Sequence, residues 1–236
     1  MNDEKNTVLD LIMSNVINKN DYVELLSACI GKVYSNQIEL QEYLGNYQKW
    51  NVTISKGELY IDDKKFDVDF LGTTSNSDGM WFNADLEKQI LERYMQALFS
   101  SYKNIEKYSI GEILPKKVKL DDLYTDHSLA IIYTALSGKN TCYFKGNGDV
   151  SIFMIFNNIP ENIVKSTDAN KFANRTMYII QNFNVKHRLM IKSFAISNGN
   201  EFVEENDSII VKFTNDSSLI FKFDDKDRLI NISGNL

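Results

Sequence analysis

The chain of 236 residues contains only two cysteines, two histidines and two prolines. Two cysteines are too few for a disulfide framework. Cys29 and Cys142 each lie in an apolar run, which predicts small buried side chains in a reducing compartment. The cysteines and the two histidines, His127 and His187, are scattered singly, whereas structural zinc sites use paired ligands at short spacings. We therefore expect no metal site and no cofactor.

Arginine is scarce as well, and long apolar runs are missing. The 32 acidic side chains outnumber the 26 basic ones, which gives a net charge of -6. Proteins that track nucleic-acid backbones gain affinity from clustered cations, so we expect no nucleic-acid partner. No stretch reaches the roughly 18 apolar residues of a membrane span, and the first residues, MNDEKNTVLDLIMSNV, do not resemble a secretory signal. A cytoplasmic protein without a membrane segment is the expectation.

No motif in the chain fixes a reaction. Gly-x-Ser-x-Gly is missing, and Gly146-Asn147-Gly148 joins two expected strands rather than a strand and a helix, as a dinucleotide fingerprint would require. Nothing in the sequence ties either histidine to a cysteine nucleophile. The adjacent pairs Asp62-Asp63, Asp121-Asp122 and Asp224-Asp225 lie at expected turns, where solvation explains them. Catalysis stays an open question, and a non-catalytic role is favoured.

Hydrophobic residues make up 43% of the chain and aromatic residues 12%, enough for a packed core. Apolar residues at steps of three and four predict helices, and Gly45 and Gly138 are expected to end two of them. The expected helices are a short one near Thr7, then 22–44, a helix following Asn83 with Leu86 to Leu98 on one face, 126–137 and 168–182.

Elsewhere the apolar residues alternate, which predicts strands. A three-stranded meander is expected over 50–54, 59–61 and 66–70, and the Asn147-Gly148 turn predicts a hairpin of 141–145 with 150–156. Four further strands are expected at 189–197, 208–213, 219–223 and 229–232. The fold class is therefore α+β: helices packed on mostly antiparallel meander sheets, ending in a helix plus a four-stranded meander. Residues 1–160 and 161–236 would form two regions or parts of one domain.

A polar segment, Gly72 to Gly79, is expected to form a loop between a strand and a helix. Backbone N–H groups of such a loop can bind an anion, although the lysine of a P-loop is missing. Long polar loops often carry function. The candidate ligand-binding residues are Thr73, Thr74, Ser75, Asp78, Trp81 and Asn83.

The same stretch carries a resemblance. Trp50, the alternating strands, Leu71-Gly72-Thr73-Thr74-Ser75 and then Trp81 resemble an uncharacterised family of bacterial cytosolic proteins, and the resemblance covers about residues 20–158. That family shows a tryptophan, a meander, Leu-Gly-Ser/Thr-x-Ser and a tryptophan-rich segment before a helix. This chain departs from it at Phe82 and Asn83, where the family tends to repeat tryptophan. The resemblance implies no activity and no site residue.

Three functions remain open. The favoured one is a non-catalytic protein-binding module, immunity- or inhibitor-like, whose acidic surface meets a basic protein partner; its candidate contacts are Asp62, Asp63, Asp67, Asp69, Glu204 and Glu205. The alternative is a small-molecule-binding protein or hydrolase with a pocket lined by the aromatic residues Trp50, Trp81 and Tyr143. A structural part in a larger assembly is the third, and the oligomeric state is not predicted.

Overall fold

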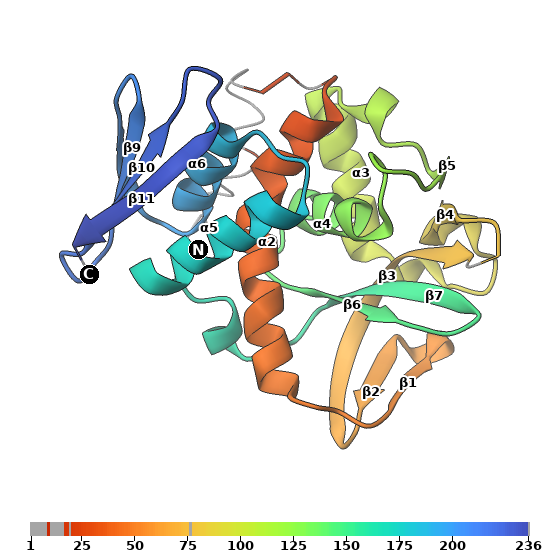
Figure 1. Ribbon diagram of the computed structural model, residues 1–236. Helices are drawn as coiled ribbons and strands as arrows, with labels where there is room; N and C mark the ends of the chain where they lie inside the picture. The colour runs from red at the N-terminus through yellow and green to blue at the C-terminus, as the bar shows by residue number, and fades with distance from the viewer. Residues whose placement is uncertain (1–8, 10–16, 19, 76, 236) are drawn as a thin grey trace. The chain divides into compact units, whose positions relative to one another are not determined.

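Helices and antiparallel strands make up most of the chain in the computed structural model, which describes residues 9, 17–18, 20–75 and 77–235 (Figure 1). The protein is therefore α+β, as the sequence predicts. The helix expected near Thr7 lies outside the described residues except at Leu9. Within the described part of the chain, no helix combines the length and the apolar character that crossing a bilayer requires.

Two compact units share the chain. One is Asn36–Val164, and the other consists of the described residues of Met1–Ser35 and of Lys165–Leu236. The helix α2 (Tyr22–Leu44) contributes residues to both. The boundary expected after residue 160 stays a prediction; in the structure, the described residues before Asn36 belong to the same unit as those after Val164.

The helix α2 begins and ends where the sequence predicts. The carboxylate of Asp21 accepts the backbone N–H groups of Val23 at 2.8 Å and of Glu24 at 3.2 Å, which is an N-terminal cap. Gly45 follows the last turn with φ of +63°, the left-handed conformation that ends many helices.

The unit formed by residues 36–164 is built around a seven-stranded antiparallel sheet in which β3 is central. The order β1-β2-β3-β4-β5 is extended by β7, which pairs with both β3 and β6. The expected meander and the expected Asn147-Gly148 hairpin are both confirmed. The strands are β1 (Trp50–Thr53), β2 (Glu58–Ile61), β3 (Lys64–Ser75), β4 (Met80–Asn83), β5 (Lys117–Lys119), β6 (Tyr143–Gly146) and β7 (Val150–Phe156).

The loop expected over Gly72 to Gly79 is wrong for its first half, because β3 continues to Ser75. The β-branched Thr73 and Thr74 pair with β4 on one side and β7 on the other, which buries them in the sheet. Gly72 is needed for close packing, since a Cβ there would lie 2.5 Å from the indole ring of Trp81.

The helix expected directly after Asn83 is also wrong. Short 3-10 turns follow Asn83, and the helix α3 (Gln96–Tyr108) begins twelve residues after the turn that starts at Ala84. The side chain of Asn83 makes no cap; instead the carboxylate of Asp69 accepts the backbone N–H of Ala97 at 2.9 Å in the first turn of α3. A helix start set by a residue 28 positions away has no local sequence signal. The expected helix at 126–137 is confirmed as α4 (Asp126–Leu136).

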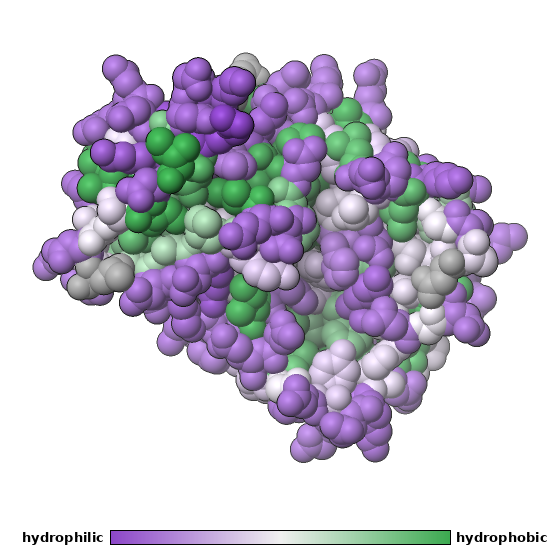
Figure 2. All heavy atoms as spheres, in the orientation of Figure 1, coloured by the Kyte–Doolittle hydropathy of each residue, from purple (hydrophilic) through white to green (hydrophobic). Residues whose placement is uncertain are grey.

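The other unit contains a four-stranded antiparallel sheet in the order β11-β10-β9-β8, with β8 (Glu201–Glu204), β9 (Ser208–Lys212), β10 (Ser218–Phe223) and β11 (Leu229–Asn235). The helices α5 (Ala169–Asn182) and α6 (His187–Ser197) contact the sheet. The ring of Phe172 in α5 stacks on Phe194 in α6 at 4.0 Å and also packs against Phe213 and Phe221. Figure 2 shows hydrophobic side chains gathered over this sheet on the face in view. The most exposed large apolar residue of the sheet is Ile230, with 65% of its surface exposed.

A four-stranded meander at the end of the chain is confirmed, but its first strand is not the one predicted. Residues 189–197 form α6, and the first strand is β8. Met190, Ile191, Phe194 and Ala195 are buried, which is helical spacing, although the same segment also shows an alternating pattern.

Candidate functional site

The candidate ligand-binding residues of the sequence lie on two neighbouring strands, except Asp78, which lies in the turn between them. Thr74 on β3 pairs with Trp81 on β4, so the packing does bring these residues together. Trp81 and Asn83 are fully buried, however, whereas the turn residue Asp78 is exposed. Ser75 is half-buried and shares a hydrogen bond of 2.9 Å with Ser77.

Asn83 is the centre of a buried hydrogen-bond network. The indole Nε1–H of Trp81 donates to Asn83 Oδ1 at 2.6 Å, and Asn83 Nδ2 donates to the hydroxyls of Tyr102 at 2.8 Å and Tyr133 at 2.9 Å. Burial raises the pKa of Tyr133 to about 12, so its hydroxyl stays protonated at neutral pH. The network uses the polar atoms of Trp81 and Asn83 inside the protein and joins β4 to α3 and α4. A ligand-binding role for this set stays a prediction.

The candidate partner-binding acids of the first unit have different surroundings. Asp63 and Asp67 are exposed, whereas Asp62 accepts backbone N–H groups from Gln48 and Lys49. Asp69 is only 3% exposed. Besides the N–H of Ala97, its carboxylate binds Lys139 Nζ at 3.2 Å and Asn157 Nδ2 at 3.0 Å. Asp69 therefore lies in the interior and not on the expected acidic surface.

The two acids expected in the C-terminal sheet are also engaged. Glu204 forms ion pairs with Lys192 at 2.6 Å and Arg188 at 3.4 Å, and these cations lower its pKa. Glu205 accepts a hydrogen bond of 3.0 Å from the hydroxyl of Ser208. Of these two acids, Glu204 therefore has its negative charge compensated by neighbouring cations.

A pocket of about 320 Å³ lies within residues 36–164. Three segments line it: the second half of α2 with the turn after it, the first turn of α4, and β6 with the turn that follows. Its lining residues are Gln37, Leu40, Gln41, Leu44, Gly45, Tyr47, His127, Tyr143, Phe144, Lys145 and Asn147. We call it the His127 pocket.

The polar centre of the His127 pocket is a pair of side chains. His127 Nδ1 lies 2.8 Å from the hydroxyl of Tyr143. The imidazole keeps exposed surface, yet the surrounding protein removes enough water to lower its pKa, an effect that Lys145 reinforces and Asp126 opposes. His127 is therefore mostly neutral at pH 7, with one ring nitrogen bonded to Tyr143 and the other available to a ligand.

Neighbouring residues hold this pair in place. Gln37 on α2 donates from Nε2 to the carbonyl oxygen of Tyr143 at 2.8 Å and accepts its N–H at 3.3 Å, so the helix side chain bonds to the edge of β6. Lys145 lies on the same face of β6 as Tyr143 and forms an ion pair of 2.7 Å with Asp126. The pocket thus combines a fixed neutral imidazole, a phenol and a cation with an apolar wall.

The aromatic residues of the expected small-molecule pocket do not all meet. Tyr143 lines the His127 pocket, and Trp50 packs at 5.8 Å against the ring of Phe144, which also lines it. Trp81 is elsewhere, buried and stacked on Tyr133. The sequence tied His127 to no metal site and to no cysteine nucleophile. Tyr143 and Lys145 at strand spacing were the available signal, but their proximity to His127 arises only from packing.

The cysteines and the possible metal ligands are the remaining residues with distinctive chemistry. Cys29 and Cys142 are both free and buried, which confirms their interpretation as small core residues, and burial raises the pKa of Cys29 to about 12. Among the residues that the structure describes, no group of three or more His, Cys, Asp or Glu side chains is placed to hold a metal ion.

The fold is α+β, and the His127 pocket lies in the unit formed by residues 36–164. The chain belongs to a family of unknown function, DUF6882, whose model matches residues 23–159, more than half of the chain. The match includes every residue that lines the His127 pocket. Comparisons with curated proteins and with solved structures found no match.

Proposed function

We propose that the unit formed by residues 36–164 is a small-molecule-binding domain and that the His127 pocket is its binding site. The supporting observation is the 2.8 Å contact between His127 and Tyr143 in a pocket that also has an apolar wall. Binding pockets commonly combine an apolar lining with a few fixed polar groups, and volumes of roughly 300–1,000 Å³ are typical. The ligand class is a small organic molecule with an apolar part and a hydrogen-bonding group that the imidazole can reach.

The first test is a thermal-shift screen of the full chain against a panel of small cytoplasmic metabolites, followed by calorimetric titration of each hit. Tyr143→Phe keeps the ring and removes only the hydroxyl that positions His127. We expect this variant to weaken binding of a hit by about tenfold, the loss of roughly one good hydrogen bond. Tyr94→Phe, in the same unit but outside the pocket, is the matched control and should leave the affinity unchanged. Hits whose affinity is the same in Tyr143→Phe and wild type would place the site elsewhere.

A second proposal is the non-catalytic protein-binding role, immunity- or inhibitor-like, with a basic partner. The net charge of -6 and the exposed carboxylates of Asp63 and Asp67 support it. The interior position of Asp69 and the ion pairs of Glu204 make the acidic surface smaller than the sequence predicts. Asp63→Lys with Asp67→Lys should abolish capture of a basic partner from the native host, and unchanged capture would contradict this proposal.

We also propose that the protein works in the cytoplasm. The two buried thiols, Cys29 and Cys142, support this compartment, because free cysteines persist where the surroundings are reducing.

A further inference from the structure

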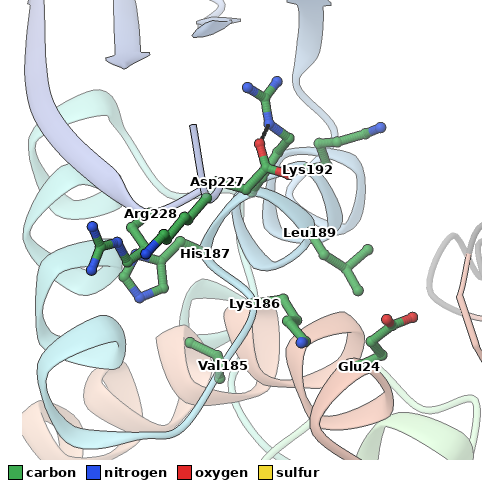
Figure 3. A pocket seen from close by; sticks show the side chains of 10 residues that line it. Glu24, Val185, Lys186, His187, Leu189, Lys192, Asp227 and Arg228 are labelled. Carbon is green, nitrogen blue, oxygen red and sulfur yellow. Dashed lines mark hydrogen bonds and ion pairs between the residues drawn. The ribbon is translucent and has the colours of Figure 1, made fainter. Parts of the chain in front are cut away.

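A second and larger pocket, of about 550 Å³, lies in the unit that contains the C-terminal sheet. It is lined by the segment that leads into α6, by the first turns of α6, by the turn between β10 and β11, and by Glu24 on α2. Its lining residues are Glu24, Val185, Lys186, His187, Arg188, Leu189, Lys192, Lys226, Asp227 and Arg228. Figure 3 shows His187 and Arg228 next to each other in this pocket, with Lys186 close to α2.

Cations dominate the lining of this pocket. Lys186, Arg188, Lys192, Lys226 and Arg228 are present, against the two carboxylates of Glu24 and Asp227. The excess of positive charge is unexpected in a chain with a net charge of -6. A concave surface with an excess of one sign of charge raises the local concentration of ligands of the opposite sign.

Both carboxylates of the lining are already engaged in hydrogen bonds. Asp227 accepts from Arg188 Nε at 2.6 Å, the ion pair drawn in Figure 3. Glu24 accepts the backbone N–H of Asn18 at 2.7 Å. The guanidinium of Arg188 is fixed further by the carbonyl oxygen of Asn206 at 2.9 Å, so the cationic wall is held in place rather than free to collapse.

Lys186 and Lys226 are different, because neither forms an ion pair with a carboxylate among the described residues. Both side chains are exposed and line the same pocket. Two lysines without a carboxylate partner therefore line one cavity of ligand size.

His187 adds a directed donor to these charges. Its Nδ1 accepts the backbone N–H of Leu229 at 3.0 Å, so in the neutral ring the proton lies on Nε2. An N–H donor beside lysine and arginine cations is suited to oxygen-rich anions that accept several hydrogen bonds, and phosphate groups are the common example in metabolites. The first turn of α6 has no side-chain cap, and the helix dipole places partial positive charge at this end. Both features favour a negative charge there.

We propose that this pocket binds a soluble phosphate-bearing metabolite of about nucleotide size, through Lys186, Lys226 and His187. The volume is too large for a single phosphate, and Val185 and Leu189 supply apolar surface for the rest of the molecule. This site is separate from the His127 pocket and does not depend on the function proposed for it.

The test is calorimetric titration of the full chain with tripolyphosphate and with ATP at low ionic strength. We expect saturable binding of at least one probe with one site per chain. Lys186→Glu and Lys226→Glu should each weaken it by at least about tenfold, because each replaces an attraction by a repulsion. Lys222→Glu is the matched control: it changes the net charge equally, is exposed in the same unit, and lies outside the pocket. Its affinity should stay within about twofold of wild type, since exposed charges outside the site are largely screened.

Three outcomes would overturn the proposal. The first is no saturable binding of either probe, and the second is an equal loss in the pocket variants and in Lys222→Glu, which would indicate non-specific attraction. The third is co-sedimentation of the protein with vesicles of anionic phospholipid without binding of the soluble probes. This result would show that the pocket recognises the phosphate of a lipid headgroup and not that of a soluble metabolite. Circular dichroism of each variant, matching that of wild type, shows that the fold is retained.

Discussion

The two histidines, His127 and His187, both have a pKa below the ordinary value of 6.5, and in both cases the main cause is the loss of water around the ring. A group whose pKa is lower in the folded protein binds fewer protons when folded, so acid favours the unfolded state. The stabilising effect of the neutral imidazoles is complete above the unfolded pKa, about 6.5, and is lost as the pH falls through the lower folded pKa values.

We predict that the free energy of unfolding of the wild type decreases from about pH 7.5 to pH 5.5. The free energy of unfolding of His127→Gln should decrease less over the same range. Urea unfolding at both pH values measures this, with His187→Gln as a second single variant. An equal decrease in wild type and in both variants would show that other groups dominate the acid response.

Among the helices, the contact between α2 and α6 makes the sharpest prediction. Gly31 lies in the middle of α2, and a Cβ there would lie 2.4 Å from the Cβ of Phe194 and 3.0 Å from its Cα. Alanine normally stabilises a helix interior relative to glycine by about 1 kcal/mol. Overpacking costs up to about 3 kcal/mol and should outweigh that gain, so we predict that Gly31→Ala lowers the free energy of unfolding by a net of about 1–2 kcal/mol.

Gly111→Ala is the control for this substitution, because its new Cβ would lie 3.6 Å from Ile105, an ordinary contact. Chemical denaturation of both variants gives the comparison. If Gly31→Ala were as stable as wild type or more stable, the close approach of the two helices would be contradicted.

The same elements show how far a sequence predicts this fold. The helices α2, α4 and α5 and the Asn147-Gly148 hairpin have their signals close by, in caps, glycines and turn residues, and were predicted. The start of α3 is set by Asp69, 28 residues before Ala97, and could not be read locally. For α6, apolar residues fit both periods, and only burial decides between them.

The residues of the candidate site also differ in whether a local sequence signal predicts them. The pocket expected from Trp50, Trp81 and Tyr143 stays a prediction; of these three residues only Tyr143 lines the His127 pocket, next to Phe144 on the same strand. His127 lies 16 positions away, and its 2.8 Å contact with Tyr143 exists only once α4 and β6 have packed. Lys186 and Lys226 are 40 positions apart, so the larger pocket had no sequence signal beyond the positive charge of residues 161–198.

At the scale of the whole molecule, each of the two pockets is lined by residues of one unit only. Binding at either site therefore needs no residue of the other unit. The two affinities are coupled only if a ligand binds one conformation of the chain more tightly than another. We predict separate footprints in hydrogen–deuterium exchange of the full protein. Tripolyphosphate should slow exchange in residues 186–192 and 226–229, and a ligand of the His127 pocket should slow it in residues 143–147.

The affinity of each ligand should also be the same, within about twofold, in the presence and absence of the other, since a coupling energy near zero leaves both dissociation constants unchanged. Lys186→Glu should erase only the first footprint, and Tyr143→Phe should weaken only the second. Protection that spreads to both units on addition of a single ligand would contradict independence. It would show instead that the chain has two conformations that differ at both pockets and that the ligand binds one of them more tightly. Only such a conformational equilibrium lets one pocket respond to a ligand in the other.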